Sequence, residues 1–89
     1  MIKILRARHL RDFVLDLEFS DGSMGEYDLA PLLARDTVLT RACREPDFFR
    51  RFFIELGALS WPNGLELSGE SIHRRLEEQG KLRRDERVA

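Results

Sequence analysis

Residues 13–28 read FVLDLEFSDGSMGEYD, and this stretch decides the fold class. Every second position from residue 13 to residue 19 is apolar, and the charged side chains of Asp16 and Glu18 lie between the later ones. A period of two predicts a β-strand with one buried face. Asp21-Gly22 then predicts a type I′ turn, because both residue types tolerate positive φ. Residues 24–28 return as the partner strand, so we expect a β-hairpin over residues 13–28.

Shorter elements extend from this hairpin in both directions. Residues 2–8 alternate in polarity and predict another strand. Spacing and turn residues after the hairpin predict helices over 29–34, 38–44 and 46–51, strands over 52–56, 58–61 and 65–67, and a helix over 69–79. The order predicts an α+β fold, with a small and mainly antiparallel sheet, short helices and a C-terminal helix. We expect residues 1–80 to form one domain and residues 81–89 a frayed or disordered tail.

Composition excludes several classes of protein. The 89 residues include 15 basic and 16 acidic side chains, for a net charge of -1. The single cysteine, Cys43, excludes a disulfide framework and a cysteine-based zinc site. No apolar run is long enough to predict a membrane span, and residues 1–9 lack the apolar segment of a signal peptide. We therefore expect a soluble cytoplasmic protein with no membrane partner.

Residue types that carry chemistry are sparse. His9 and His73 are the only histidines, and neither stands at a metal-ligand spacing. Helical spacing places Cys43 on the apolar face of its predicted helix, where it is a core residue rather than a nucleophile. No nucleophile elbow or phosphate-binding glycine loop is present. The sequence thus identifies no catalytic, cofactor-binding or metal residue and favours a protein that is not an enzyme.

The most individual feature is the run Trp61-Pro62-Asn63-Gly64. An indole beside a turn can anchor a partner, or it can close the end of a small core; the small core favours the structural interpretation. The phenylalanines at positions 48, 49, 52 and 53 cannot all face inward, so some aromatic surface is expected to remain for a partner. The candidate interaction surface consists of Phe48, Phe49, Phe52, Trp61, Pro62, Asn63 and Gly64.

The C-terminal end carries a cluster of basic residues. Residues 74–89 contain six basic and four acidic side chains, which leaves this stretch at only +2. Phosphate binding usually needs a more strongly basic face. The candidate nucleic-acid contacts are Arg74, Arg75, Arg83 and Arg84.

Four short motifs appear in a fixed order and carry a resemblance. They are FSDGS at 19–23, YDLAPLL at 27–33, PDFF at 46–49 and WPNG at 61–64. Together they resemble DUF2442, a bacterial family of proteins of unknown function, over residues 2–72. Glu66 stands where the family often has Asp, which is a conservative departure. The resemblance implies a small α+β domain without an established enzyme activity, and a protein partner encoded by a neighbouring gene in a toxin–antitoxin-like pairing.

The sequence leaves three alternative functions open. The first is a protein–protein binding or regulatory module, which acts on a neighbouring gene product or as a homodimer. The second is an accessory protein that binds nucleic acid through the basic C-terminal end. The third is a small enzyme whose site, near Trp61, would combine Asp21, Asp28, Asn63 and Glu66.

Overall fold

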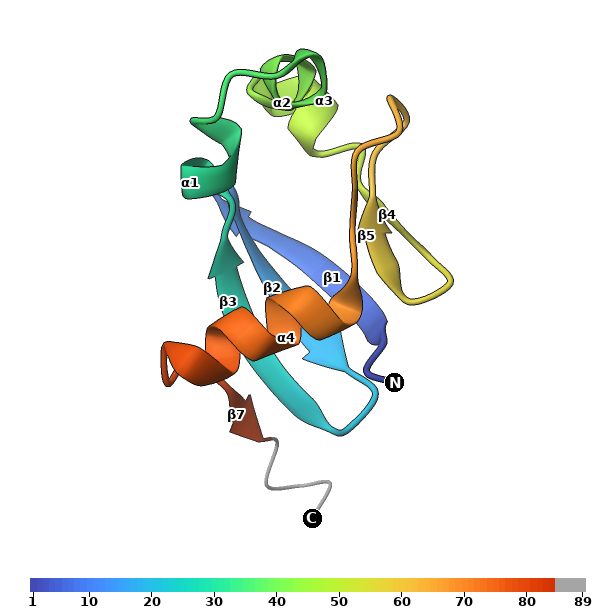
Figure 1. The fold of residues 1–89 in the computed structure, drawn as a ribbon, viewed down its shortest axis with the longest axis vertical. Helices are drawn as coiled ribbons and strands as arrows, with labels where there is room; N and C mark the ends of the chain where they lie inside the picture. The colour runs from blue at the N-terminus through green and yellow to red at the C-terminus, as the bar shows by residue number, and fades with distance from the viewer. Residues whose placement is uncertain (85–89) are drawn as a thin grey trace.

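The first three strands form an antiparallel meander, to which a short C-terminal strand is added. The computed structural model describes residues 1–84 (Figure 1). The sheet has the order β1-β2-β3-β7. Its strands are β1 (Ile4–Arg11), β2 (Val14–Phe19), β3 (Ser23–Asp28) and β7 (Arg83–Arg84). The predicted strand at the N-terminus and the hairpin over 13–28 are confirmed.

The turn between β2 and β3 differs from the prediction. Gly22 has a φ of 87°, but Asp21 is not in the left-handed region that a type I′ turn requires. The loop instead has three residues, and the Gly22 amide donates to the Phe19 carbonyl at 3.0 Å. The Asp21 carboxylate accepts hydrogen bonds from the Ser23 amide and hydroxyl. These local bonds favour the longer turn.

Three short helices gather beyond one end of the sheet, at the top of Figure 1. They are α1 (Ala30–Leu33), α2 (Val38–Cys43) and α3 (Pro46–Phe49), close to the predicted ranges. The N-cap of α1 is Leu29, and Asp28, just before it, accepts a hydrogen bond from the Ala30 amide at 2.9 Å. Thr37 and Thr40 form a capping box at the start of α2.

The later strands form a second antiparallel sheet instead of joining the first. Its order is β4-β5-β6, with β4 (Phe53–Glu55), β5 (Ala58–Ser60) and β6 (Glu66–Leu67). Leu56 and Gly57 make the β4–β5 turn with φ values of 51° and 83°. The β4 strand runs beside β1, which brings the two sheets together.

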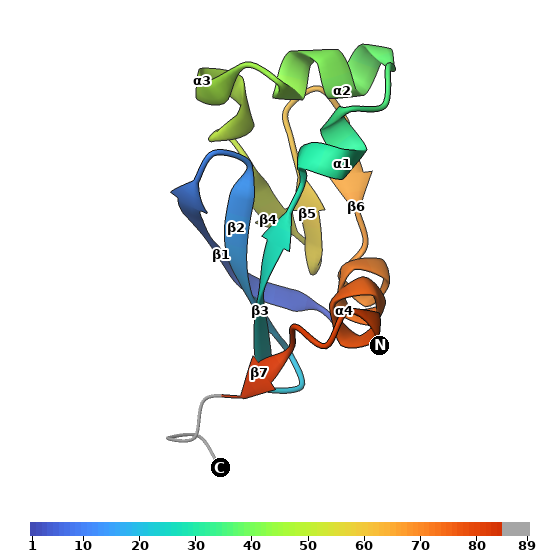
Figure 2. The ribbon, with the colours of Figure 1, turned by 90° about the vertical axis from the view of Figure 1, so that its left-hand side faces the viewer.

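Helix α4 (Gly69–Glu78) covers one face of the first sheet (Figures 1 and 2). Its Ser68 cap accepts a hydrogen bond from the Ser71 amide at 3.1 Å. Ile72 and Leu76 are buried and belong to the same core as the apolar residues of β2. A Cβ atom on Gly25 would lie 2.9 Å from Leu76 Cδ1, so the glycine permits the close approach of helix and sheet. The α+β fold class is confirmed.

Residues 81–84 are ordered, contrary to the prediction from the sequence. Gly80, with a φ of 68°, turns the chain back after α4, and the Lys81 amide donates to the Leu76 carbonyl at 2.8 Å. Arg83 and Arg84 then pair with Met24 and Ser23 of β3 as strand β7. The prediction of a frayed tail is therefore wrong for residues 81–84. Residues 85–89, the remainder of that prediction, lie outside the described residues.

None of the helices within residues 1–84 has the length and apolar character needed to cross a bilayer.

Candidate functional site

The two faces of the first sheet carry different side chains. Residues that pair directly in an antiparallel sheet point to the same side. Leu15 and Leu17 point toward α4 and are buried. The alternate positions point away from α4 and form what we call the outer face: Arg6 and Arg8 on β1, Asp16 and Glu18 on β2, Met24 and Glu26 on β3, and Arg83 on β7.

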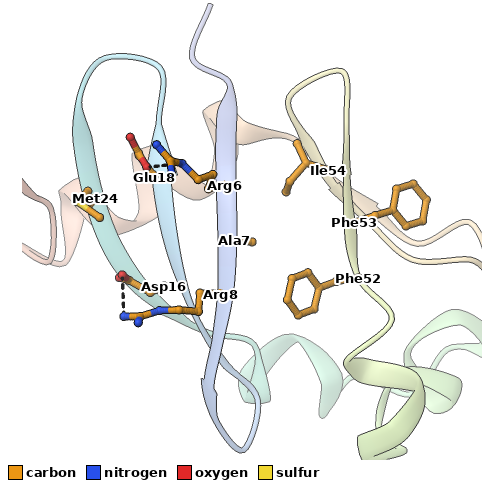
Figure 3. Close-up of a pocket in the computed structure, with 9 residues that line it drawn as sticks. All are labelled: Arg6, Ala7, Arg8, Asp16, Glu18, Met24, Phe52, Phe53 and Ile54. Carbon is orange, nitrogen blue, oxygen red and sulfur yellow. Dashed lines mark ion pairs between the residues drawn. The ribbon is translucent and has the colours of Figure 1, made fainter.

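A cleft of about 660 Å³ lies on this outer face and extends to the second sheet (Figure 3). Its lining comprises Arg6, Ala7, Arg8, Asp16, Glu18, Met24, Phe52, Phe53 and Ile54. Strands β1 and β4 both contribute side chains, although no ladder of hydrogen bonds joins them. Two segments far apart in sequence therefore build one surface.

Ion pairs cross the strands of the outer face. Arg6 Nε lies 3.1 Å from Glu18 Oε2. The Asp16 side chain is 8% exposed, and Arg83 NH2 donates to both of its carboxylate oxygens at 2.9 Å. Arg8 lies 3.9 Å from the same carboxylate, and its side chain is 76% exposed. Since Asp16 already has a close partner in Arg83, Arg8 holds the weaker position in this cluster.

Apolar side chains border the charged residues. In Figure 3, Phe52 and Ile54 point from the second sheet toward β1, and Phe53 points away from it. Phe53 is 42% exposed and Leu5, which follows Ile4 at an irregularity in β1, is 54% exposed. Exposed apolar side chains beside arginines are a combination typical of protein interfaces.

Within the run Trp61-Pro62-Asn63-Gly64, the side chains of Trp61 and Asn63 have a structural role. Trp61 is 2% exposed, and its Nε1 donates to the Phe49 carbonyl at 2.8 Å. Asn63 Nδ2 donates to the Leu39 carbonyl at 3.0 Å, while its Oδ1 accepts from the Leu65 amide. These bonds tie α2 and α3 to the second sheet. Pro62 and Gly64 lie exposed at the turn.

The predicted aromatic surface is divided by the fold. Phe49 is buried against Trp61, with ring centroids 5.8 Å apart, and Phe48 is half-buried beneath Arg51. Phe52 is half-buried and lines the cleft. Of the seven candidate residues, Phe52 is the one that reaches the described cleft.

Residues of the predicted enzyme site are not brought together. Asp21, Asp28 and Glu66 line three different hollows of the described surface, and Asn63 lines none of these. Asp21 instead accepts hydrogen bonds from Ser23 Oγ at 2.6 Å and from His73 Nε2 at 2.9 Å. The carboxylate is central in this cluster, so the histidine does not touch the serine hydroxyl as a general base must. The arrangement holds the β2–β3 turn to α4.

Two pKa shifts accompany these local structures. Burial by itself raises the pKa of Asp21, but hydrogen bonds from Ser23 and His73 outweigh it and lower the pKa to about 2. Burial raises the pKa of the Cys43 thiol, which keeps it protonated at neutral pH.

Within residues 1–84, no three His, Cys, Asp or Glu side chains gather as a metal site requires.

Comparison with known proteins places the chain in a family. The family model described as protein of unknown function (DUF2442) matches residues 4–78. The chain belongs to the DUF2442 family. No curated protein and no solved structure matches it. The DUF2442 match includes every residue that lines the cleft, whereas β7 lies beyond its end.

The basic candidates at the C-terminal end of this DUF2442 protein have intramolecular partners. Arg83 binds Asp16, and Arg84 NH1 donates to the Asp21 carbonyl at 2.7 Å. Arg75 NH1 donates to the Tyr27 hydroxyl at 3.2 Å. Arg74 is exposed on α4. Three of the four side chains therefore contribute to the fold.

Several cleft residues of this DUF2442 chain were not among the candidates from the sequence. Arg6, Arg8 and Ile54 line the cleft, although the sequence predicted no function for them. Phe53 also lines it and was one of the four phenylalanines expected to leave aromatic surface, but it is not among the seven candidates. A signal was present, because the arginines alternate with Ala7 in the first strand and face the acidic positions of the second. The sequence does not show that residues 52–54 lie beside that strand.

Proposed function

We propose that this DUF2442 protein is a protein–protein binding module and that the cleft on the outer face is its binding surface. The observation that supports this most directly is the contrast between the two faces of one sheet. Helix α4 covers the inner face, whereas no helix among residues 1–84 covers the outer face (Figure 2). The outer face combines arginines with aromatic and aliphatic side chains around a cleft.

Catalysis in this cleft has less support. Its two carboxylates, Asp16 and Glu18, each lie in an ion pair with an arginine. A general acid or base must be free to exchange a proton with a bound substrate, whereas arginines engage both of these carboxylates. The cleft also lacks a histidine, cysteine or serine among the residues that line it. Its chemistry fits recognition of another surface better than a reaction.

The family resemblance supplies one candidate partner, the product of a neighbouring gene. A regulatory role of the toxin–antitoxin type would require that this product bind the DUF2442 chain. Co-expression of the two proteins followed by co-purification tests this form of the proposal. Retention that is lost when Arg8 is replaced by Glu would assign the contact to the outer face.

A photo-crosslinking side chain at the cleft tests the general proposal. Benzoylphenylalanine replaces Phe52, an aromatic residue of similar shape that points toward β1 in the cleft (Figure 3), in cells that naturally contain the protein. The matched control carries the same group at Glu78, which is exposed on α4 and thus on the covered side of the sheet. We expect a discrete protein adduct from position 52 and none from position 78. No adduct, or equal adducts from both positions, would contradict the proposed surface.

A further inference from the structure

We infer that the occupant of this cleft is a second copy of the same chain, related by a two-fold axis parallel to β1 and β2. The inference rests on the proposed function and specifies the partner. It comes from the order in which side chains of different character cross the outer face, and from the register of the strands that carry them.

Four bands of side chains cross this face from the second sheet to β3 (Figure 3). The first band is apolar and contains Phe52 and Ile54. The second is basic, with Arg6 and Arg8, and the third is acidic, with Glu18 and Asp16. Met24 supplies the fourth, which is again apolar at this level of the sheet.

At the level of Arg6 and Glu18 the order apolar, basic, acidic, apolar is complementary to itself, whereas Glu26 takes the fourth position at the level of Arg8 and Asp16. The two-fold axis runs parallel to the strands, midway between the two facing sheets and above the gap between β1 and β2. It places β1 over the partner's β2, and β4 over the partner's β3. This rotation keeps each residue at its height along the strands. Since Arg6 pairs with Glu18 in register, each copy's Arg6 meets the other copy's Glu18. Met24 lies at the same level and meets Ile54 of the other copy.

The arginines have the capacity for such contacts. Arg6 approaches Glu18 through Nε, and its side chain is 81% exposed. Its terminal nitrogens are therefore available to a second carboxylate, because a guanidinium group offers donors in several directions. Two symmetric Arg6–Glu18 pairs would close into a four-membered cluster at the axis. Arg8 instead faces the other copy's Asp16, which Arg83 of that copy already holds, so the Arg6–Glu18 pairs carry the specificity.

A different symmetric arrangement, edge-to-edge pairing of β1 with a second β1, is disfavoured. It would bring the basic side chains of the two β1 strands together, and like charges on opposite strands destabilise a sheet. The β4 strand also lies beside that edge. Face-to-face packing avoids both problems and resembles the aligned packing of two sheets in a sandwich.

The size of the face sets the expected affinity. Four strands at about 4.8 Å spacing and six residues of strand length give a face of roughly 19 by 20 Å. At about 380 Å² per copy this is below the size of stable specific interfaces and is typical of weak, transient ones. We therefore expect a reversible dimer with a Kd in the range of about 1–100 μM.

Sedimentation velocity from about 1 to 500 μM, with charge-reversed variants, tests the inference. The wild type should change from monomer to dimer over this range. Arg6→Glu and Glu18→Arg should each weaken self-association by tenfold or more, because each places like charges opposite one another across the axis. Arg74→Glu makes the same charge change as Arg6→Glu, but on α4, and should leave the dimer unchanged.

Mixing the two variants gives the sharpest outcome. The carboxylate introduced by Arg6→Glu faces the arginine introduced by Glu18→Arg, so an equimolar mixture should form a heterodimer with affinity near that of the wild type. Circular dichroism of each variant confirms that its fold is retained.

Three results would overturn the inference. They are a wild type that remains monomeric at 500 μM, a dimer that Arg6→Glu does not weaken, and a mixture that stays monomeric. The crosslinking experiment separates this inference from the proposed function. An adduct of position 52 with a different protein would support the binding module and exclude the second copy as its occupant.

Discussion

At the scale of single residues, Trp61 links parts of the chain that are distant in sequence. Its indole ring is buried against Phe49, and its nitrogen donates to the Phe49 carbonyl at 2.8 Å. The carbonyl lies at the end of α3, and the ring follows β5. The Trp61 side chain thus fills the core with a large apolar ring and also provides a hydrogen-bond donor to a buried backbone carbonyl.

Replacing Trp61 with Phe should lower the free energy of unfolding by about 2–3 kcal/mol, because the Phe49 carbonyl loses its donor and the core loses volume. Urea denaturation followed by circular dichroism measures the change. Arg74→Ala, on the exposed side of α4, is the control and should stay within about 0.5 kcal/mol of the wild type. A Trp61→Phe variant as stable as this control would contradict the role assigned to the indole.

Asp21 couples the stability of the fold to acid. Hydrogen bonds lower its pKa from 3.8 to about 2, so the ionised carboxylate stabilises the folded state at neutral pH. This contribution is fully present above the unfolded value of 3.8 and is lost as the pH falls through the folded value of about 2. Because the side chain is partly exposed, we expect a contribution of about 1–2 kcal/mol.

Asp21→Asn should therefore be less stable than the wild type by this amount at pH 7, and the difference should shrink toward zero near pH 2. Thermal denaturation at several pH values measures it. Asp12→Asn, in the β1–β2 turn, controls for the loss of one exposed carboxylate. A difference that is constant from pH 7 to pH 2 would show that ionisation of Asp21 does not contribute.

Asp21 also shows a limit of prediction from the sequence. The alternation over residues 13–19 predicts the strand, and the turn residues predict the hairpin. The geometry of the turn depends further on His73, which lies 52 positions away and binds the Asp21 carboxylate. Local patterns carry no information about a contact at that separation.

At the scale of elements, the packing of α4 on the sheet depends on Gly25. An added Cβ would meet Leu76 Cδ1 at 2.9 Å and the Lys81 carbonyl oxygen at 3.2 Å. Gly25→Ala should therefore destabilise the protein by about 1–3 kcal/mol through overpacking. Glu26→Ala, at the next position and exposed, is the matched control. If chemical denaturation gives equal stabilities for the two variants, α4 can move away from the sheet at little cost.

Elements with strong local patterns were predictable, and those that depend on long-range contacts were not. The apolar spacing and Ser68 cap predict α4, and short runs predict the strands around Gly57. Strand β7 has only two residues, both arginines, and no local β-pattern. It is ordered by pairing with β3 and by the contact of Arg83 with Asp16, 67 positions away. The cleft was missed for the same reason, since the side-by-side position of β1 and β4 is not encoded in either strand alone.

At the scale of the whole molecule, the balance of charge limits the possible partners. The net charge is -1, and the arginines of the outer face lie among carboxylates. At the C-terminal end, Arg83 and Arg84 are engaged by Asp16 and Asp21. We therefore expect no mobility shift of a 20-base-pair duplex at up to about 100 μM protein in 50 mM salt.

A shift that disappears as salt is raised would contradict this expectation and revive the nucleic-acid alternative. Arg74→Ala together with Arg75→Ala would then identify the contact. Each lost phosphate contact reduces the slope of log affinity against log salt by about one. A shift insensitive to both substitutions would assign the contact to other basic residues.

The position of Trp61 has an optical consequence. It is the only tryptophan in the chain and is 2% exposed, so the intrinsic fluorescence of the protein originates from one buried point. That point lies where α3 meets the second sheet. Emission at short wavelength and protection from acrylamide quenching should characterise the native state. A red shift would therefore report that α3 has separated from the second sheet, without any label added to the protein.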